Sequence, residues 1–349
     1  MSGPLSGVTI IELAGLGPAP FAGMMLADNG ATVIRVQRPG VTADPYDVLA
    51  RSREVRTVDL RTNEGVAAVK ELARHADGLI EGFRPGVIER LGIGPEVLLD
   101  ANPALVVGRM TGWGQDGPYA AMAGHDLNYI ALTGALNANR RGDALPAIPL
   151  NLVGDFGGGG MLLAFGMVSA ILAARASGRG QVIDCAMTDG TALLMGMVMG
   201  FHAQGAWLDK PASNVMDTGC HFYEVYETAD DKLISIAAAE PQFYALLREK
   251  TGTANDPDFD NQHDRTAWPR LKAKLVAIFR ARTQAEWCAI LEGSDVCFAP
   301  VLSMTEAPHH PHNVARGTYV EVGGYVQPAP APRYSVTAND KPRPPFCAS

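Results

Sequence analysis

The sequence predicts an α/β protein with a Rossmann-like large domain and a smaller α+β domain. Over about the first 190 residues, short β-branched runs alternate with longer helical segments, a pattern typical of a parallel sheet covered by helices. After about residue 219 the pattern changes to a hairpin followed by further helices. The length of 349 residues is sufficient for two domains.

The first βαβ unit begins with a strand at 8–13 and ends with a strand at 32–36. Between them, 21–29 is predicted to be a helix that Gly30 closes. The loop before this helix lacks a G-x-G-x-x-G pattern because Pro18 and Pro20 interrupt it. A simple α/β layer without a bound dinucleotide is therefore the favoured interpretation.

The same alternation of strands and helices continues along the large domain, and the second half of the chain has a different pattern. The remaining elements of the first half are helices at 63–75 and 85–91, strands at 78–82 and 105–110, an apolar helix from about 158, a turn and strand at 178–184, and an apolar helix at 193–207. In the second half, strands at 222–227 and 233–237 form a hairpin, and helices begin near 240, 267 and 283. The predicted boundaries are 1–188 for the large domain, 189–219 for a linker helix, 220–317 for the small domain and 318–349 for an extended tail that returns to the large domain.

Charge and cysteine content restrict the partners and the compartment. A formal net charge of −8 disfavours attraction of the whole molecule to nucleic acid or to an anionic membrane. The five cysteines are scattered without a CxxC pair, which is typical of reduced thiols, and the N-terminus lacks the features of a secretory signal. We therefore expect a cytoplasmic protein. The uncharged run before Arg175 is nearly long enough to span a bilayer, but a buried helix is the better interpretation.

His125 and Asp155 are the most informative side chains of the chain. Each lies beside glycine and next to a predicted helix start. An imidazole and a carboxylate on opposite sides of one carbon are suited to removing a proton from one face and returning it to the other, which is racemase chemistry. The structural alternatives are a non-catalytic histidine and an N-cap for the helix that follows Asp155. Glu240, before Pro241, is either a helix cap or an acid that orients a histidine.

Arginines are concentrated early in the chain, and histidines late. Six arginines lie between 35 and 61, and Arg84 and Arg90 follow in the next α/β unit. Arginine pairs well with phosphate, so a phosphorylated ligand and an ordinary solvated surface are both open interpretations. The histidines at 309, 310 and 312 are interrupted by proline and lack matching cysteines or carboxylates, so a solvated loop is favoured over a metal site.

Five segments together resemble the racemases of the family III CoA-transferase superfamily. They are 112–118 (Gly-Trp-Gly-Gln-Asp-Gly-Pro), 123–129 (Ala-Gly-His-Asp-Leu-Asn-Tyr), 149–160 (Pro-Leu-Asn-Leu-Val-Gly-Asp-Phe and four glycines), 178–184 (Gly-Arg-Gly-Gln-Val-Ile-Asp) and 240–244 (Glu-Pro-Gln-Phe-Tyr). The resemblance extends from the first strand to about 333. It implies a homodimer of interlocked chains, CoA held in the large domain, and a small domain of the partner that closes the site.

The resemblance also implies roles for individual residues. His125 and Asp155 are the expected acid–base pair and Glu240 is the supporting acid, with no metal and no organic cofactor. The implied CoA contacts are Arg38, Val58, Asp59, Leu60, Arg61, Gly82, Phe83, Arg84, Arg90, Gly124, Asp126, Leu127, Asn128 and Tyr129.

The implied reaction is a 1,1-proton transfer on a 2-methylacyl-CoA thioester through an enolate. The alternative is a CoA-transferase with Asp155 as nucleophile, which needs no partner histidine. A CoA-binding regulatory protein is a third, less favoured interpretation. The segment 216–223 (Met-Asp-Thr-Gly-Cys-His-Phe-Tyr) departs from the family pattern Leu-Asp-Gly-Gly-Ala-Pro-x-Tyr, which leaves the acyl group open. Cys220 and His221 are interpreted there as pocket-lining or surface residues. The methionines at 187, 195, 197 and 199 are interpreted as either a tolerant acyl surface or core.

Overall fold

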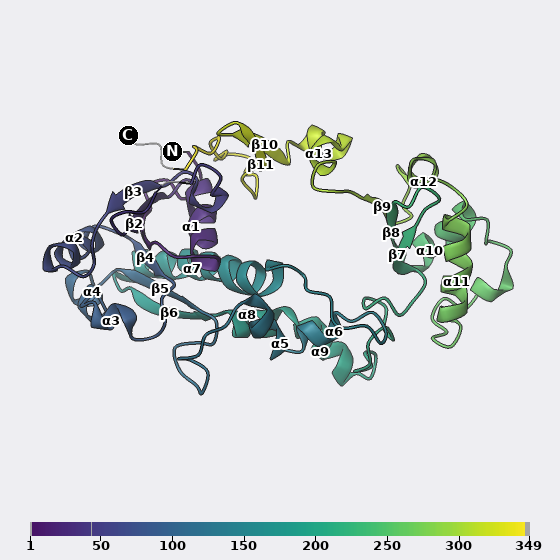
Figure 1. The fold of residues 1–349 in the computed structure, drawn as a ribbon, viewed down its shortest axis with the longest axis horizontal. Helices are drawn as coiled ribbons and strands as arrows, with labels where there is room; N and C mark the ends of the chain where they lie inside the picture. Colours follow the sequence, from purple (N-terminus) through teal and green to yellow (C-terminus); the bar gives the residue numbers. More distant parts are fainter. Residues whose placement is uncertain (1, 43, 346–349) are drawn as a thin grey trace. The chain divides into compact units, whose positions relative to one another are not determined.

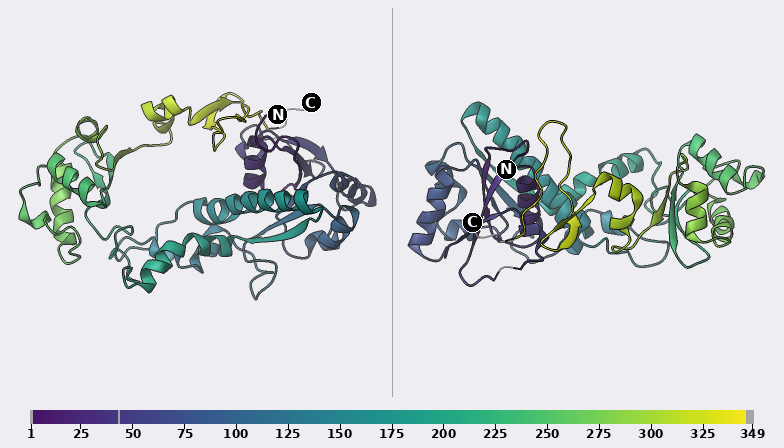
Figure 2. Two further views of the ribbon diagram at one scale, coloured as in Figure 1. Left: turned by 180° about the vertical axis from the view of Figure 1, so that it is seen from behind. Right: turned by 90° about the horizontal axis from the view of Figure 1, so that it is seen from above.

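A computed structural model describes residues 2–42 and 44–345 and divides them into two compact units. Of these residues, the first unit contains 2–42, 44–135, 149–196 and 312–345, and the second contains 136–148 and 197–311. Figures 1 and 2 show the chain from three directions. The predicted boundaries differ at three points. Residues 136–148, assigned to the large domain, cluster with the second unit, where Arg141 pairs with Glu224 at 2.8 Å. The predicted linker 189–219 is divided between the units after 196, and 312–317, assigned to the small domain, cluster with the first unit.

The first unit is built on a parallel sheet of six strands. Its strand order is β3-β2-β1-β4-β5-β6, the order of a doubly wound Rossmann fold. The strands are β1 (Thr9–Leu13), β2 (Thr32–Gln37), β3 (Glu54–Thr57), β4 (Gly78–Glu81), β5 (Val106–Thr111) and β6 (Gln181–Ala186). Every pairing between them is parallel. β3 was not predicted, because its charged sequence and exposed edge position hide the apolar pattern of a strand.

Helices cover both faces of this sheet. The helices of the unit are α1 (Pro18–Asp28), α2 (Asn63–Arg74), α3 (Val87–Arg90), α4 (Pro95–Ala101), α5 (Asp126–Ala131), the π-helical segment η2 (Leu152–Met161), α7 (Leu162–Ser177), α8 (Met187–Leu194) and α13 (Pro311–Arg316). Successive strand residues point to opposite faces, so Ile10 packs with α1 and α7 while Ile11 packs with α2, α3 and α4. α1 begins earlier than predicted, since Pro18 and Pro20 lie in its first turn, where proline is tolerated.

The continuous helix formed by η2 and α7 is apolar along its whole length. By length and composition Leu152–Ser177 qualifies to cross a membrane, and 44% of its most apolar window is buried in the protein. The prediction that this helix is buried is therefore confirmed for only one of its sides. The other side leaves Met161, Phe165, Val168 and Leu172 exposed at a spacing that places them on one face.

The C-terminal tail packs against the first unit and contains a short hairpin of β10 (Tyr319–Val322) and β11 (Tyr325–Pro328). Arg51 is 1% exposed and donates to the Gln327 side chain at 2.9 Å and to the Pro328 carbonyl at 2.7 Å. The same guanidinium pairs with the Asp28 carboxylate. Residues far apart in sequence thus share one buried polar cluster.

The second unit has a three-stranded antiparallel sheet in the order β7-β8-β9. Its strands are β7 (Tyr223–Glu227), β8 (Leu233–Ala237) and β9 (Phe298–Val301), and its helices are α6 (Ala135–Ala138), α9 (Gly196–Ala203), α10 (Pro241–Lys250), α11 (Trp268–Phe279) and α12 (Gln284–Leu291). The predicted hairpin is confirmed. The predicted helix at 193–207 is instead broken at Met195, between α8 and α9.

Cys220 and His221 lie in the core of the second unit. Both are fully buried and pack with Phe222, Tyr244 and Phe259. The His221 Nε2 is 2.8 Å from the Tyr244 hydroxyl. The interpretation of this segment as pocket-lining or surface is therefore wrong, because an aromatic cluster surrounds it.

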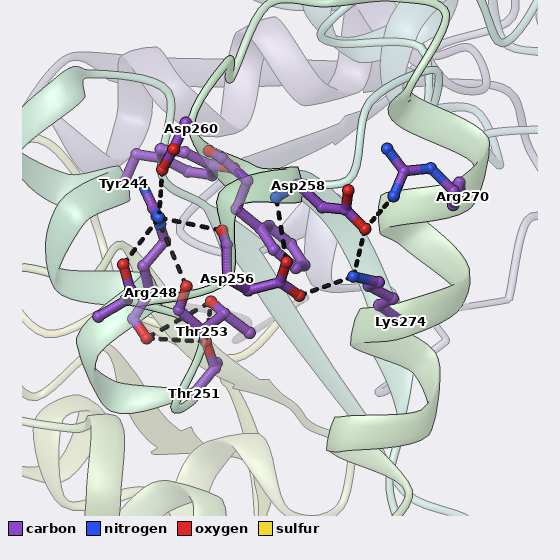
Figure 3. Close-up of polar contacts among 11 residues, drawn as sticks. Tyr244, Arg248, Thr251, Thr253, Asp256, Asp258, Asp260, Arg270 and Lys274 are labelled. Atoms are coloured by element: carbon purple, nitrogen blue, oxygen red, sulfur yellow. Dashed lines mark hydrogen bonds and ion pairs between the residues drawn. The ribbon is translucent and has the colours of Figure 1, made fainter.

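A network of ion pairs fixes the loop after α10, as Figure 3 shows. Lys274 of α11 donates to Asp256 at 2.7 Å and to Asp258 at 2.5 Å. Arg248 of α10 pairs with Asp260 at 2.8 Å. The loop is thus tied to both helices between which it runs.

Candidate active site

Two adjoining cavities open at the carboxyl ends of the strands of the first unit. We call them the His125 cavity, of about 700 Å³, and the Arg38 cavity, of about 760 Å³. The His125 cavity lies beyond β1, β4 and β5, and the Arg38 cavity beyond β1, β2 and β3. Leu16 and Phe83 line both. The strand order reverses between β1 and β4, and this switch point is where doubly wound sheets bind ligands.

His125 lines the His125 cavity from the residue that precedes α5. Its backbone N–H donates to the Asn128 side chain at 3.1 Å, which fixes the start of the helix. The preceding Gly124 carbonyl accepts from the Tyr129 hydroxyl, and the Tyr129 ring packs edge-on against Trp113. A Cβ at position 124 would lie 2.7 Å from the Tyr129 ring, so the close packing here requires glycine. The imidazole side chain itself is exposed to the cavity.

Asp155 lines the same cavity from η2. A π-helical segment inside a longer helix is frequently found at functional sites. The Asp155 N–H donates to the Asp126 carboxylate at 2.7 Å, and the Asp155 carboxylate accepts from the Asn151 side chain at 3.3 Å. Burial raises the pKa of Asp155, and the negative charge of Asp126 raises it further, while the Asn151 hydrogen bond and His125 act in the opposite direction. A carboxyl with a raised pKa is better suited to exchange protons near neutral pH.

Most of the residues predicted to contact CoA line one of the two cavities. Arg38, Val58, Asp59, Leu60 and Arg61 line the Arg38 cavity. Gly82, Phe83, Arg84, Gly124 and Tyr129 line the His125 cavity, with Phe83 shared between the two.

Four of the predicted CoA contacts line neither cavity. They are Arg90, Asp126, Leu127 and Asn128. Arg90 is exposed on α3, and Leu127 and Asn128 are exposed on α5. The Asp126 side chain is only 5% exposed, and its carboxylate binds the Asp155 backbone instead.

The arginine-rich segment divides into structural and exposed members. Arg35 and Arg53 both pair with the fully buried Glu12 of β1, at 2.5 Å and 2.8 Å. Together with Arg51 they form buried ion pairs that stabilise the fold, so three of the six arginines are not free to bind a phosphate. The buried acids Glu12 and Asp28, placed within apolar runs of the sequence, were the signal that these arginines had internal partners.

Arg38 and Arg61 are the exposed members that line the Arg38 cavity. Arg61 donates to Asp59, and this hydrogen bond lowers the pKa of Asp59 to about 2. Within the arginine-rich segment, these two guanidinium groups are therefore the candidates for binding a phosphate in the Arg38 cavity.

Sequence reasoning missed Asn151 and Trp113, which also line the His125 cavity. Asn151 precedes Asp155 by four residues, a spacing that brings side chains together on a helix. Glu240, the predicted supporting acid, is exposed at the N-terminus of α10 in the second unit. Its action on His125 stays a prediction.

The chain is similar to known proteins over nearly its whole length. The model of the family described as CoA-transferase family III matches residues 5–346. The alpha-methylacyl-CoA racemase of Mus musculus is 43% identical over 95% of this chain and 87% of its own. The acetyl-CoA:oxalate CoA-transferase of Acetobacter aceti is 30% identical over 93% of this chain and 88% of its own. A crystal structure of Rv3272 from M. tuberculosis matches with a TM-score of 0.82 at 26% identity, covering 99% of this chain and 96% of that one. The chain therefore belongs to CoA-transferase family III.

Proposed function

We propose that this protein is a racemase that interconverts the (R) and (S) forms of 2-methylacyl-CoA thioesters. The single observation that carries the proposal is that His125 and Asp155 line one cavity at the switch point of the sheet. Relatives with the same activity in their names support it at 43% and 42% identity.

The two adjoining cavities suit the two ends of a CoA thioester. Arg38 and Arg61 offer guanidinium groups for the phosphates of the nucleotide end in the Arg38 cavity. The pantetheine chain then passes Leu16 and Phe83, which line both cavities. The thioester reaches the His125 cavity, where the two titratable side chains stand.

The proton transfer uses each member of the pair once. One of them, unprotonated, removes the α-proton from one face of the substrate and leaves a planar enolate. The other, protonated, donates to the opposite face, and the roles exchange in the reverse direction. Each step of acid–base catalysis contributes roughly 10²- to 10⁴-fold.

Stabilisation of the enolate oxygen supplies the rest of the rate enhancement. The first turn of α5 leaves backbone N–H groups without intrahelical acceptors. The N–H of Asp126, the residue after His125, is the candidate donor to the enolate oxygen. Glu240 is the proposed partner that holds the His125 tautomer.

The decisive experiment follows α-proton exchange. The protein is incubated in D₂O with one epimer of a 2-methylacyl-CoA and no acyl acceptor. Deuterium at the α-carbon together with epimerisation supports the racemase, and His125→Ala is expected to abolish both. Full activity in that variant would remove His125 from the mechanism.

A CoA-transferase is the second candidate, favoured by the accessible Asp155 carboxylate and by the transferases among the relatives. In this reaction Asp155 attacks the thioester, expels CoA and forms a mixed anhydride. Hydroxylamine trapping of an acyl group on Asp155, without α-proton exchange, would establish the transferase and reject the racemase.

The acyl group of the substrate is left open. Met110 and Met187 line the His125 cavity, and thioether side chains accommodate varied apolar shapes. Met197 and Met199 are exposed in the second unit. Comparison of kcat/KM for branched fatty acyl, bile-acid and arylpropionyl thioesters would define the range.

A homodimer of interlocked chains is also proposed. Its support is the exposed apolar face of the continuous η2–α7 helix, formed by Met161 at the end of η2 and by Phe165, Val168 and Leu172 of α7. Such a face is unfavourable in water unless another surface covers it. A second copy is the partner to which the family resemblance points.

The reaction is proposed to need no metal and no organic cofactor, because the thioester itself acidifies the α-proton. Dialysis against a chelator is expected to leave the exchange rate unchanged. We also propose a cytoplasmic location, supported by the free thiols of Cys185, Cys220, Cys288 and Cys297.

A further inference from the structure

Asp126 joins the two elements that carry the proposed acid–base pair. It is the first residue of α5, directly after His125, and its carboxylate accepts the backbone N–H of Asp155 at 2.7 Å. His125 and Asp155 come from segments about thirty residues apart in the chain. One buried side chain thus links the start of α5 to η2.

The packing around this carboxylate is close. A Cβ on Gly154 would lie 2.6 Å from the Asp126 Oδ1 and 3.1 Å from Ile130. Only glycine at 154 therefore lets the carboxylate approach the Asp155 amide. The link between the two elements depends on both residues.

The second oxygen of Asp126 has an unusual environment. Oδ2 is buried and has no hydrogen-bond partner among residues 2–42 and 44–345. A buried carboxylate with a single donor is costly to maintain, since each unsatisfied polar group loses its hydration without replacement. Helix capping alone would not require this arrangement, because a cap normally faces its own helix.

We propose that Asp126 is a positioning residue of the proton-transfer pair, which fixes η2 against the start of α5 and places a negative charge beside the Asp155 carboxyl. The inference rests on the proposed racemase function. The charge favours the protonated form of Asp155, in the same direction as burial. Asp155 must hold a proton in one direction of the reaction and lose it in the other.

Two substitutions separate position from charge. Asp126→Asn keeps an oxygen that can accept the Asp155 N–H but removes the charge. Asp126→Ala removes both. In Asp126→Ala, kcat for α-proton exchange is expected to fall about tenfold to a hundredfold, with KM within about twofold, because misplacement of a catalytic group slows the chemical step.

The pH profile is the readout that a purely structural role would not move. Without the charge, Asp155 ionises at lower pH. In Asp126→Asn, the acidic limb of kcat therefore moves to lower pH in the direction where Asp155 is the base. In the reverse reaction, where Asp155 is the acid, the basic limb of kcat moves to lower pH.

Asp77→Asn is the matched control, since Asp77 also accepts a backbone N–H, from Thr9 at 2.9 Å, but at the amino ends of β1 and β4, away from the two cavities. Its pH profile should match the wild type. Gly154→Ala provides an independent variant and should lower kcat as Asp126→Ala does.

The possible outcomes test the positioning role of Asp126 separately from the proposed racemase function. If the wild-type protein shows no exchange, the racemase proposal fails. If the wild type exchanges and Asp126→Asn keeps the wild-type pH profile in both directions, the positioning role of Asp126 is wrong and the racemase stands. If Asp126→Asn loses thermal stability but neither limb of its pH profile of kcat moves, the positioning role of Asp126 is likewise wrong.

Discussion

Single residues around Asp155 set its proton affinity in opposite directions. The hydrogen bond from Asn151 lowers the pKa of Asp155, whereas burial and Asp126 raise it. Asn151→Ala is therefore expected to raise this pKa further. The acidic limb of kcat should move to higher pH where Asp155 acts as the base, opposite to the effect of Asp126→Asn.

The measurement for Asn151→Ala is kcat for α-proton exchange across pH, starting from each epimer. Asn63→Ala, at the exposed start of α2, serves as the control with the wild-type profile. A limb that moves to lower pH in Asn151→Ala would contradict the assigned hydrogen bond.

His221 makes the stability of the second unit depend on pH. Burial lowers its pKa from 6.5 to about 4, so the unfolded chain binds the proton more readily than the folded unit. Stability is complete above about pH 6.5 and falls as pH decreases toward 4, by about 3 kcal/mol for a shift of this size.

The free energy of unfolding, measured between pH 7 and pH 4 by hydrogen exchange of β7 and β8 amides, tests this contribution. His221→Gln should reduce the pH dependence over this range. His309→Gln, which changes an exposed histidine, should retain it. An unchanged slope in His221→Gln would exclude His221 as the source.

Among the elements, the sheet and most helices of the first unit were predictable because buried segments carry strong apolar patterns. β1, β2 and β5 follow from β-branched runs, and β4 follows from a short apolar segment at Leu79 and Ile80. β3 was missed because alternating charge replaces apolar alternation at the sheet edge. The π-helical form of η2 was also missed, since glycines alone do not specify how far apart the hydrogen-bonded groups lie along the helix.

The candidate site was likewise predictable only in part. His125 and Asp155 were identified from their glycine neighbours, and the structure brings them to one cavity. The role of Asp126 was not predictable, because its contact with the Asp155 backbone depends on how α5 packs against η2. The acid Glu12 within an apolar run indicated that a buried partner was needed, but the sequence did not specify that this partner would be Arg35 and Arg53, which are distant from it in the chain.

The exposed face of α7 leads to a test at the level of this helix. Phe165→Asp with Leu172→Asp places two charges on that face, and we expect the proposed dimer to dissociate. Sedimentation velocity measures the state. Val97→Asp, on the exposed surface of α4, should leave the dimer intact. A dimer of unchanged stability in the double variant would show that α7 is not the interface.

At the scale of the whole molecule, Arg51 connects the beginning and the end of the chain. Arg51→Met would leave the Asp28 carboxylate buried without its partner, and the loss of one member of a buried pair costs about 3 kcal/mol or more. We expect faster hydrogen exchange of the α1 amides and easier proteolysis of the tail.

Arg56→Met is the matched control for Arg51→Met. Arg56 is exposed and lies 3.8 Å from Glu54, so its loss should change stability by less than about 1 kcal/mol. Equal protection of the α1 amides in wild type and Arg51→Met would show that the cluster does not hold the tail.

The Arg51 cluster also has a consequence for the order of biosynthesis. All six strands of the parallel sheet have left the ribosome once Ala186 has emerged, and N-terminal parts generally fold first. Gln327 and Pro328, two of the acceptors of Arg51, are translated only after the entire second unit. A nascent chain can therefore assemble its sheet while Arg51 still lacks these two acceptors, and the first unit is completed only after the whole second unit has been translated.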